Sequence, residues 1–279
     1  MKGVPAPPLT TFVLVFICCL SLPGWGDDLL FYDSFEEEEW KKWVLQFCPE
    51  PSMSAGIPRV STAVDMIDAE GVDAREGRRA ARFYLHSSDC SSFGGPRAEI
   101  AVPGGFGYIG DSEWWFGASL FLPDNNPIST NNFIISQWHG RISRGVPLAV
   151  VLANEDILVV LSHGLTVKMP LELGVWIDFV WHVIWTNDRF GLYELWIDGR
   201  QIVELHNVPT LAALVEEPVG SVYWKLGLYG GKMKEGTSAT VYWDSIRIAS
   251  SAGSYDDVAP RQRDGDRADE GVAERKSDF

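Results

Sequence analysis

Apolar and polar residues alternate with a period of two along most of the central chain. Only the segment 36–43 (EEEEWKKW) predicts a helix, and a short one, whereas the 3.6-residue period of a long helix is missing. Short runs of β-branched and aromatic residues recur between Gly, Pro, Asn and Asp, as strands do. These runs are 114–122, 132–139, 147–152, 157–161, 176–185, 192–197, 221–229 and 239–248. The pattern therefore predicts an all-β chain of short antiparallel strands.

One turn between these runs has a specific signature. Asp198-Gly199 separates the alternating segments 192–197 and 200–204, and this dipeptide supplies the positive φ that a tight hairpin turn needs. Many antiparallel strands joined by such turns form two packed sheets. The expected fold class is therefore a two-sheet antiparallel β-jelly roll.

Composition sets the size of the core and limits the partners. Of 279 residues, 46% are hydrophobic, so the chain can bury a large core. The formal net charge of −15 argues against binding nucleic acid or an anionic membrane through overall charge. The 12 Trp residues exceed what an ordinary core needs and indicate flat surfaces for stacking. Sugars are one ligand that uses such surfaces.

The first 26 residues (1–26) have the organisation of a signal peptide. Lys2 supplies a positive start, and the apolar run 12–20 is too short for a bilayer span, which needs about 20 residues. An N-terminal membrane anchor is the alternative. We expect a secreted, extracellular protein with no membrane contact after removal of the signal. In an oxidising compartment Cys48 and Cys90 can form one disulfide, or they remain two buried thiols.

The other end of the chain is highly charged. Residues 251–279 hold almost no large apolar side chains and cannot bury enough surface to offset their ordering entropy. They are predicted to be a disordered tail. Residues 27–250 then form one domain.

Three of the predicted segments carry a polar face. Residues 97–100, 137–139 and 223–229 each alternate, so that small or apolar side chains take one side of a strand and polar ones the other. Each strand therefore has one apolar face that can pack in the core and one polar face that can bind or react with a ligand. The polar faces carry Arg97, Glu99, Gln137, His139, Tyr223, Lys225 and Tyr229.

The order Arg97-x-Glu99, Gln137-x-His139 and Lys225-x-Gly227-x-Tyr229 resembles the active-site signature of the jelly-roll polysaccharide lyases. That group includes alginate lyases, glucuronan lyases and heparin lyase I. The segments 115–123 and 195–199 are most similar to the glucuronan lyase and heparin lyase I side of the group. The likeness covers nearly all of residues 30–249. It implies a concanavalin A-like sandwich that cleaves a 4-linked uronic acid polymer, glucuronan first.

Two departures make alginate the less favoured substrate. Ile100 stands where alginate lyases often have a second arginine. Gly230-Gly231 follows Tyr229 where those enzymes usually carry Asn-Gln.

Elimination in such a polymer removes the proton at C5 and expels the oxygen at C4. The neighbouring carboxylate must first be neutralised, a task that suits Gln137 as donor and Arg97 as cation. Tyr229 and His139 are the candidate proton-transfer groups. Tyrosine ordinarily titrates near 10, so a tyrosine base needs a nearby cation such as Lys225.

Sugar stereochemistry decides between the two groups. In β-glucuronate or mannuronate the proton and the oxygen leave from the same side, so Tyr229 alone can act as base and then as acid. In iduronate or guluronate they leave from opposite sides, which favours His139 as base and Tyr229 as acid. We expect the first case.

The remaining site residues are assigned to binding and support. Lys225 and Tyr223 would contact substrate, and Glu99 would orient Arg97 or Lys225, although an ordinary Arg97–Glu99 ion pair is the alternative. Trp115 is predicted to stack on a sugar, with packing an equal alternative. The histidines outside the signature are assigned structural roles: His86, His163, His182 and His206.

Catalysis by these groups requires no cofactor. No His or Cys spacing matches a zinc site. The resemblance implies a structural calcium between the first and last strands, with Asp33 and Asp244 as oxygen ligands, and two solvated carboxylates are the alternative.

The expected partner is an anionic polysaccharide, bound by a monomer. A lectin-like sandwich that binds the polymer without cutting it is the alternative function, but it would not need Gln137, His139 and Tyr229 together. A glycoside hydrolase would need two facing carboxylates, and the strand pattern typical of such sandwich hydrolases is missing.

Overall fold

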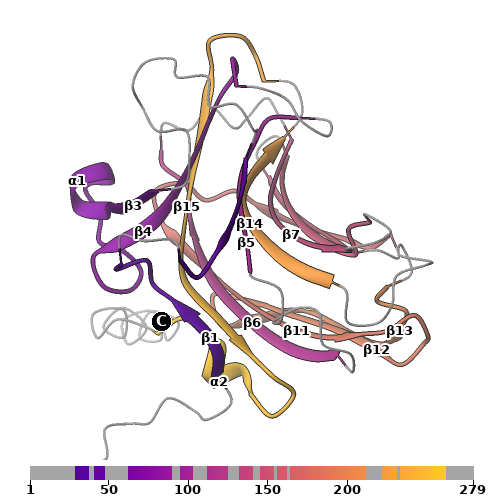
Figure 1. Cartoon of the computed structure of the whole chain (residues 1–279). Helices are drawn as coiled ribbons and strands as arrows, with labels where there is room; N and C mark the ends of the chain where they lie inside the picture. Colours follow the sequence, from indigo (N-terminus) through magenta and orange to yellow (C-terminus); the bar gives the residue numbers. More distant parts are fainter. Residues whose placement is uncertain are drawn as a thin grey trace, which may run out of the picture.

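Two antiparallel sheets face each other in the computed structural model (Figure 1). The structure describes residues 29–37, 41–47, 62–89, 95–102, 112–124, 132–140, 145–153, 156–161, 164–211, 222–230 and 233–261. Within these ranges the chain is almost entirely strand and turn, with two short helices. The predicted all-β jelly roll is confirmed.

The first sheet, sheet A, has eight strands. Its order is β13-β12-β11-β6-β15-β4-β3, and β1 also pairs with β15. The strands are β1 (Leu29–Asp33), β3 (Thr62–Asp65), β4 (Arg79–His86), β6 (Ser112–Phe121), β11 (Trp176–Trp185), β12 (Gly191–Ile197), β13 (Arg200–Val208) and β15 (Ser238–Ala249).

The second sheet, sheet B, has seven strands in the order β10-β9-β8-β7-β14-β5-β2. These are β2 (Val44–Phe47), β5 (Arg97–Ala101), β7 (Phe133–Gly140), β8 (Leu148–Ala153), β9 (Asp156–Leu161), β10 (Thr166–Pro170) and β14 (Val222–Gly230). In Figure 1, β5, β14 and β7 lie side by side above β6, β11, β12 and β13. Three segments far apart in the sequence thus become neighbours.

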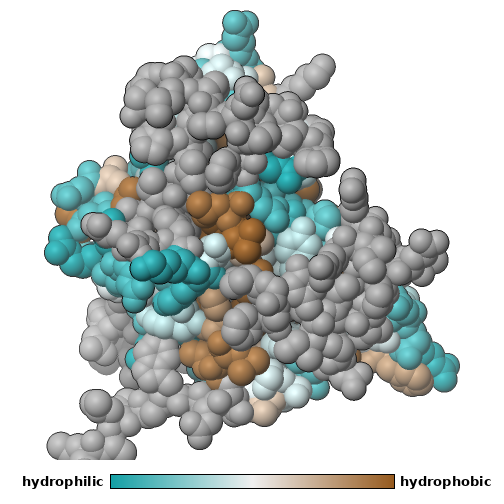
Figure 2. Space-filling model, in the orientation of Figure 1, coloured by the Kyte–Doolittle hydropathy of each residue, from teal (hydrophilic) through white to brown (hydrophobic). Residues whose placement is uncertain are grey.

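Tryptophan rings fill the space between the sheets. Trp138 stacks on Trp224 with ring centroids 5.2 Å apart, and Trp181 meets Trp138 edge-on at 5.1 Å. Such aromatic pairs each add about 1 kcal/mol beyond their area burial. Trp243 is fully buried as well, so the inward direction predicted for Trp138, Trp224 and Trp243 is confirmed. Figure 2 shows hydrophilic residues around much of one face and hydrophobic residues in its middle.

The hairpin between β12 and β13 has the predicted turn. Asp198 and Gly199 both adopt positive φ, 48° and 78°. Ile197 and Arg200 pair across it. The two positive φ values are those of a type I′ turn, which matches the twist of the flanking strands.

The short helices are not where the sequence pattern suggested. The described part of 36–43, which leaves out 38–40, contains no helix, so that prediction is wrong. Helix α1 (Met66–Glu70) instead begins where the Asp65 side chain accepts a hydrogen bond from the Ile67 N–H and ends at Gly71, with φ 73°. A side-chain cap and a left-handed terminal glycine together define such a short helix.

Helix α2 (Tyr255–Val258) lies inside the segment predicted to be disordered. Val258 is fully buried in a cluster with Val180 and Ala249 on sheet A. A Cβ at Gly117 would lie 1.8 Å from the Val258 carbonyl oxygen, so β6 needs a glycine there. The domain therefore continues to about residue 261, beyond the predicted boundary at 250, because Val258, with Tyr255 and Ala259 packed on the same cluster, anchors the segment.

Several predictions concern residues outside the described ranges. The signal peptide (1–26), the end of the tail (262–279), Cys48 and Cys90 all lie there. In the described part of the chain, no helix has the length and apolar character to cross a bilayer.

Candidate active site

The polar faces of β5, β14 and β7 form one continuous surface on sheet B, directed away from the core. β14 lies between the other two strands and pairs with both. Inward residues of the same strands, such as Ile100, Trp138 and Leu226, belong to the core. We call the outward set the polar strip: Arg97, Glu99, Gln137, His139, Tyr223, Lys225 and Tyr229.

Strand register divides the polar strip into rows. Tyr229 pairs with Arg97 and Gly227 pairs with Glu99 on the β5 side. On the β7 side Lys225 pairs with Gln137, and Tyr223 with His139. The three sequence motifs, on β5, β7 and β14, therefore lie on adjacent strands of one sheet.

Gly227 allows the middle of the polar strip to form. Its φ is 137°, and a Cβ there would lie 2.2 Å from the Ala98 carbonyl oxygen. The β14–β7 register also shifts between Leu226 and Tyr229. This glycine therefore lets β5 approach β14 closely, and the Gln137 Nε2 donates to Glu99 Oε1 at 2.5 Å across the width of β14.

Glu99 lies between two cations. Its carboxylate and the Lys225 ammonium are both buried, and Arg97 Nη1 is 3.7 Å from Glu99 Oε2. Burial raises the pKa of Glu99, while Lys225, Gln137 and Arg97 act in the opposite direction. Burial likewise lowers the pKa of Lys225, against the attraction of Glu99. With two cations and one carboxylate, this part of an acidic protein can attract an anion.

His139 has a defined tautomer when neutral. Its Nδ1 lies 2.6 Å from the Gly140 carbonyl oxygen, which can only accept. Nδ1 therefore carries the proton, and Nε2 keeps the lone pair that a base requires. The ring lies 5.4 Å from that of Tyr223, and the Lys225 Nζ lies 5.2 Å from the centre of the Tyr223 ring.

Tyr229 lies at the other end of the polar strip. The Arg97 Cζ is 4.5 Å from the centre of its ring, within cation–π distance. Tyr229 follows Tyr223, the partner of His139, by six residues along β14. At about 3.3 Å per residue this is roughly 20 Å between backbones, shortened by the bulge. The fold thus brings Arg97 to Tyr229, but places His139 and Tyr229 in separate rows.

A family model described as polysaccharide lyase matches residues 65–247, which include the whole polar strip. The chain belongs to the polysaccharide lyase family. It is therefore an enzyme, and the polar strip is the natural candidate for its active site.

Solved structures of lyases share the fold. The endo-β-1,4-glucuronan lyase from the fungus Trichoderma reesei matches with a TM-score of 0.63 at 15% identity, covering 84% of this chain and 100% of that chain. The alginate lyase AlgAT5 from polysaccharide lyase family 7 matches with a TM-score of 0.51 at 13% identity, covering 75% of this chain and 94% of that chain. A comparison with curated protein sequences gave no match. At these identities the matches show the jelly-roll fold alone.

Trp115 of this lyase is not part of the polar strip. It lies on β6 of sheet A, on the face opposite the core. Its ring stacks on His182 at 3.8 Å with an interplanar angle of 4°, and Trp196 lies beside it. The predicted sugar contact is therefore corrected to packing on the far side of the sandwich, because the period-two pattern gives the face of a strand and not the sheet it joins.

The calcium ligands predicted for the lyase do not form a calcium site. The Asp33 carboxylate accepts from the Phe35 N–H at 2.9 Å and the Trp43 Nε1 at 2.7 Å. The Asp244 carboxylate accepts from the Glu76 and Ser245 N–H groups at 2.9 and 2.6 Å. Each of these four carboxylate oxygens accepts one backbone or indole N–H.

Burial, with Glu76 and Glu36 nearby, holds the pKa of Asp244 well above its usual range. Among the described residues neither aspartate belongs to a group of three carboxylate, imidazole or thiol ligands. Calcium prefers six to eight oxygens, so these residues do not fit it.

The other histidines have different surroundings. His86 Nδ1 lies 2.8 Å from Ser88 Oγ. His182 and His206 both contact carboxylates on sheet A, at 2.6 to 3.0 Å. His163 lies outside the described ranges.

Proposed function

We propose that this lyase cleaves a 4-linked uronic acid polymer by β-elimination on the polar strip, with glucuronan as the first candidate. The observation that carries the proposal is the pairing of Arg97 with Tyr229, beside the Gln137–Glu99 hydrogen bond. Two cations and an amide donor on an otherwise acidic protein suit a polyanionic sugar chain. Similarity in fold to a glucuronan lyase over 84% of this chain supports the choice of first substrate.

In the proposed reaction Arg97 and Gln137 neutralise the uronate carboxylate, so that negative charge can develop at C5. Starting as the phenolate, the Tyr229 oxygen takes the C5 proton, the electron pair forms the C4–C5 double bond, and the C4–oxygen bond breaks. The leaving oxygen receives the proton from Tyr229, which returns to its starting state. Every step uses a protein side chain.

The separation of rows favours this one-residue mechanism over a two-residue one. A base and an acid acting on one sugar must both reach it, and the β7 partners of Tyr229 and Tyr223, Ile134 and His139, are five residues apart, roughly 17 Å between backbones. His139, Tyr223 and Lys225 would then bind the next units of the polymer. With iduronate or guluronate, His139 as base and Tyr229 as acid is the alternative arrangement, and it requires both side chains to reach across the rows to one sugar.

We further propose that the lyase is secreted and acts as a monomer on extracellular polymer. The charged start and apolar core of residues 1–26 support secretion. Mass spectrometry of the N-terminus after expression in a secreting host tests it, since cleavage after residue 26 is expected.

The function is tested by following the ultraviolet absorbance of the unsaturated uronate while the mature protein is mixed with glucuronan, alginate, heparin or hyaluronan. Only elimination creates that chromophore. A rise with glucuronan is expected. A rise in absorbance with another polymer alone would overturn the assignment of glucuronan as substrate. Binding to the polymers without any rise in absorbance would favour the lectin-like alternative.

A further inference from the structure

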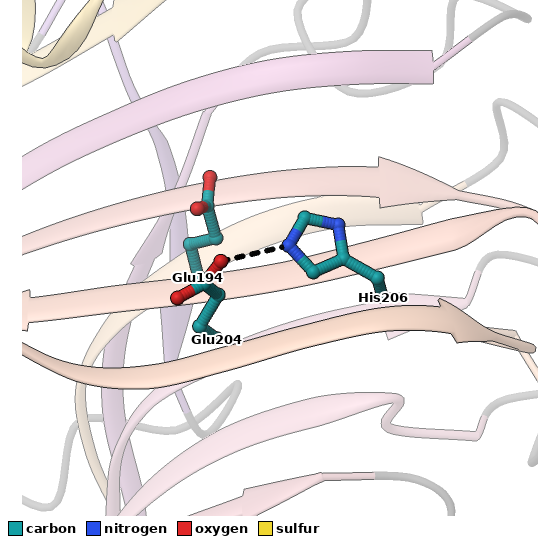
Figure 3. Close-up of side chains that lie close together, drawn as sticks. All are labelled: Glu194, Glu204 and His206. Atoms are coloured by element: carbon teal, nitrogen blue, oxygen red, sulfur yellow. Dashed lines mark hydrogen bonds and ion pairs between the residues drawn. The ribbon is translucent and has the colours of Figure 1, made fainter.

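A second group of chemically active side chains lies on the opposite side of the sandwich, on the outer face of sheet A. In β12 and β13 the residues Tyr193, Leu195 and Val203 face the core. Glu194 and Glu204 alternate with them and face outward. His206 follows on the same side of β13, and Figure 3 shows the three side chains together.

The geometry of these three side chains is that of a ligand set. Glu194 and Glu204 are direct cross-strand partners. His206 Nε2 lies 3.0 Å from Glu204 Oε1, and one ligand atom from each residue lies within 4.8 Å of the other two. Ligands of a tetrahedral zinc ion, each about 2.0–2.2 Å from the metal, have similar mutual spacing after small rotamer changes.

Placing two carboxylates opposite each other across paired strands is unfavourable, because like charges in this position repel. A cation shared by both carboxylates removes the repulsion. The pair therefore has an electrostatic reason to bind one.

Glu194 is also held in place by residues that would not touch the ion. His182 Nδ1 lies 2.6 Å from Glu194 Oε2, and its Nε2 lies 2.8 Å from Glu113 Oε1. Gln201 Nε2 donates to Glu194 Oε1 at 3.1 Å. Trp115 stacks on the His182 ring and fixes its plane. Hydrogen bonds that orient a ligand carboxylate are typical of preorganised metal sites.

We propose that Glu194, Glu204 and His206 bind a divalent zinc ion, with His182 as a positioning residue. An imidazole and two carboxylates suit zinc better than calcium or magnesium, which prefer oxygen ligands alone. Three protein ligands leave the fourth position for water, because Glu204 and His206 are more than half exposed.

Such an ion would cross-link β13 to β12. In the described part of the chain β13 is an edge strand of sheet A, with a strand neighbour on one side only. The site lies on the other sheet from the polar strip, and its role is therefore structural and independent of the proposed function.

The experiment is a zinc titration of the full chain without an affinity tag, with cysteines alkylated, in competition with a chelating fluorophore. His206→Ala and Glu204→Gln should each weaken zinc binding at least tenfold, and His182→Gln about tenfold through Glu194. His86→Ala is the matched control and should change nothing, since the His86 imidazole contacts the Ser88 hydroxyl, outside the proposed ligand set. Equal affinity in all four variants would overturn the proposal.

Two further measurements separate ion type and role. Calcium in place of zinc should not compete, and competition at equal concentration would overturn the zinc assignment. Zinc should increase the protection of β13 amides from hydrogen exchange in the parent protein and in His86→Ala, but not in His206→Ala. Because His206 is exposed, this variant should keep the thermal midpoint of the zinc-free parent, so a loss of binding cannot be attributed to unfolding.

Discussion

The Arg97 guanidinium lies over the ring of Tyr229, with Cζ 4.5 Å from the ring centroid, although 132 positions separate the two residues in the chain. β5 and β14 are adjacent and the two residues are direct partners in their register. The pairing places a cation over the ring whose hydroxyl group the proposed elimination uses. It also leaves the carboxylate-binding and proton-transfer functions on neighbouring strands of one rigid sheet.

Replacing Tyr229 by Phe tests the proton-transfer assignment. The ring remains for Arg97, but the hydroxyl is lost, so kcat should fall by about 10²–10⁴-fold while polymer binding stays the same. Turnover and affinity electrophoresis measure the two effects. Tyr84→Phe is the matched control, since Tyr84 on β4 also lies beneath an arginine, Arg82, at 5.4 Å. Near-full activity of Tyr229→Phe would contradict the mechanism.

Gly227→Ala tests the glycine at the close approach of β5 and β14. The new Cβ would meet the Ala98 carbonyl oxygen and force β5 away from β14. We expect the free energy of unfolding to fall by about 2–4 kcal/mol, with loss of activity. Gly236→Ala is the control, because Gly236 also has positive φ but no atom within 4 Å of its Cβ. It should cost about 1 kcal/mol. Equal costs at both positions would show that close packing is not the reason for Gly227.

The pH dependence of stability tests the burial of Glu99. Because its folded-state pKa is raised, the native state binds more protons than the unfolded state between the two pKa values. The stabilisation from protonated Glu99 is full below the unfolded pKa near 4.3 and is lost as pH rises through the folded pKa. Urea unfolding from about pH 4 upward should show this decline in the parent and a weaker one in Glu99→Gln. A steeper decline in the variant would contradict the assignment.

Trp115→Ala separates packing from sugar binding. Trp115 stacks on His182 on the far side of the sandwich, so KM and polymer affinity should remain unchanged. The free energy of unfolding should fall by about 2–4 kcal/mol, because a large half-buried ring is removed. Tyr223→Ala should show the opposite result, with weaker polymer binding. A raised KM for Trp115→Ala would instead support the predicted contact between Trp115 and the substrate.

The sequence by itself determined the fold class and the residue types of the site. Period-two alternation gives the face of each strand, since side chains point to opposite sides in turn. It therefore placed Trp138 and Trp224 inward, and Gln137 and Lys225 on the chemical face. Asp198-Gly199 determined its hairpin locally, because positive φ is a property of those two residues.

Only the tertiary structure decided which faces meet. Strand order and register depend on pairings between distant segments, which no local pattern contains. For this reason Trp115 could be assigned to a strand face but not to a sheet, and His182 and His206 had no visible partners until Glu194 and Glu204 came opposite each other. Strand pairing also sets the distance between Tyr229 and His139. That distance depends on the rise of an extended strand and on one β-bulge, and the spacing of the sequence motifs shows neither the pairing nor the bulge.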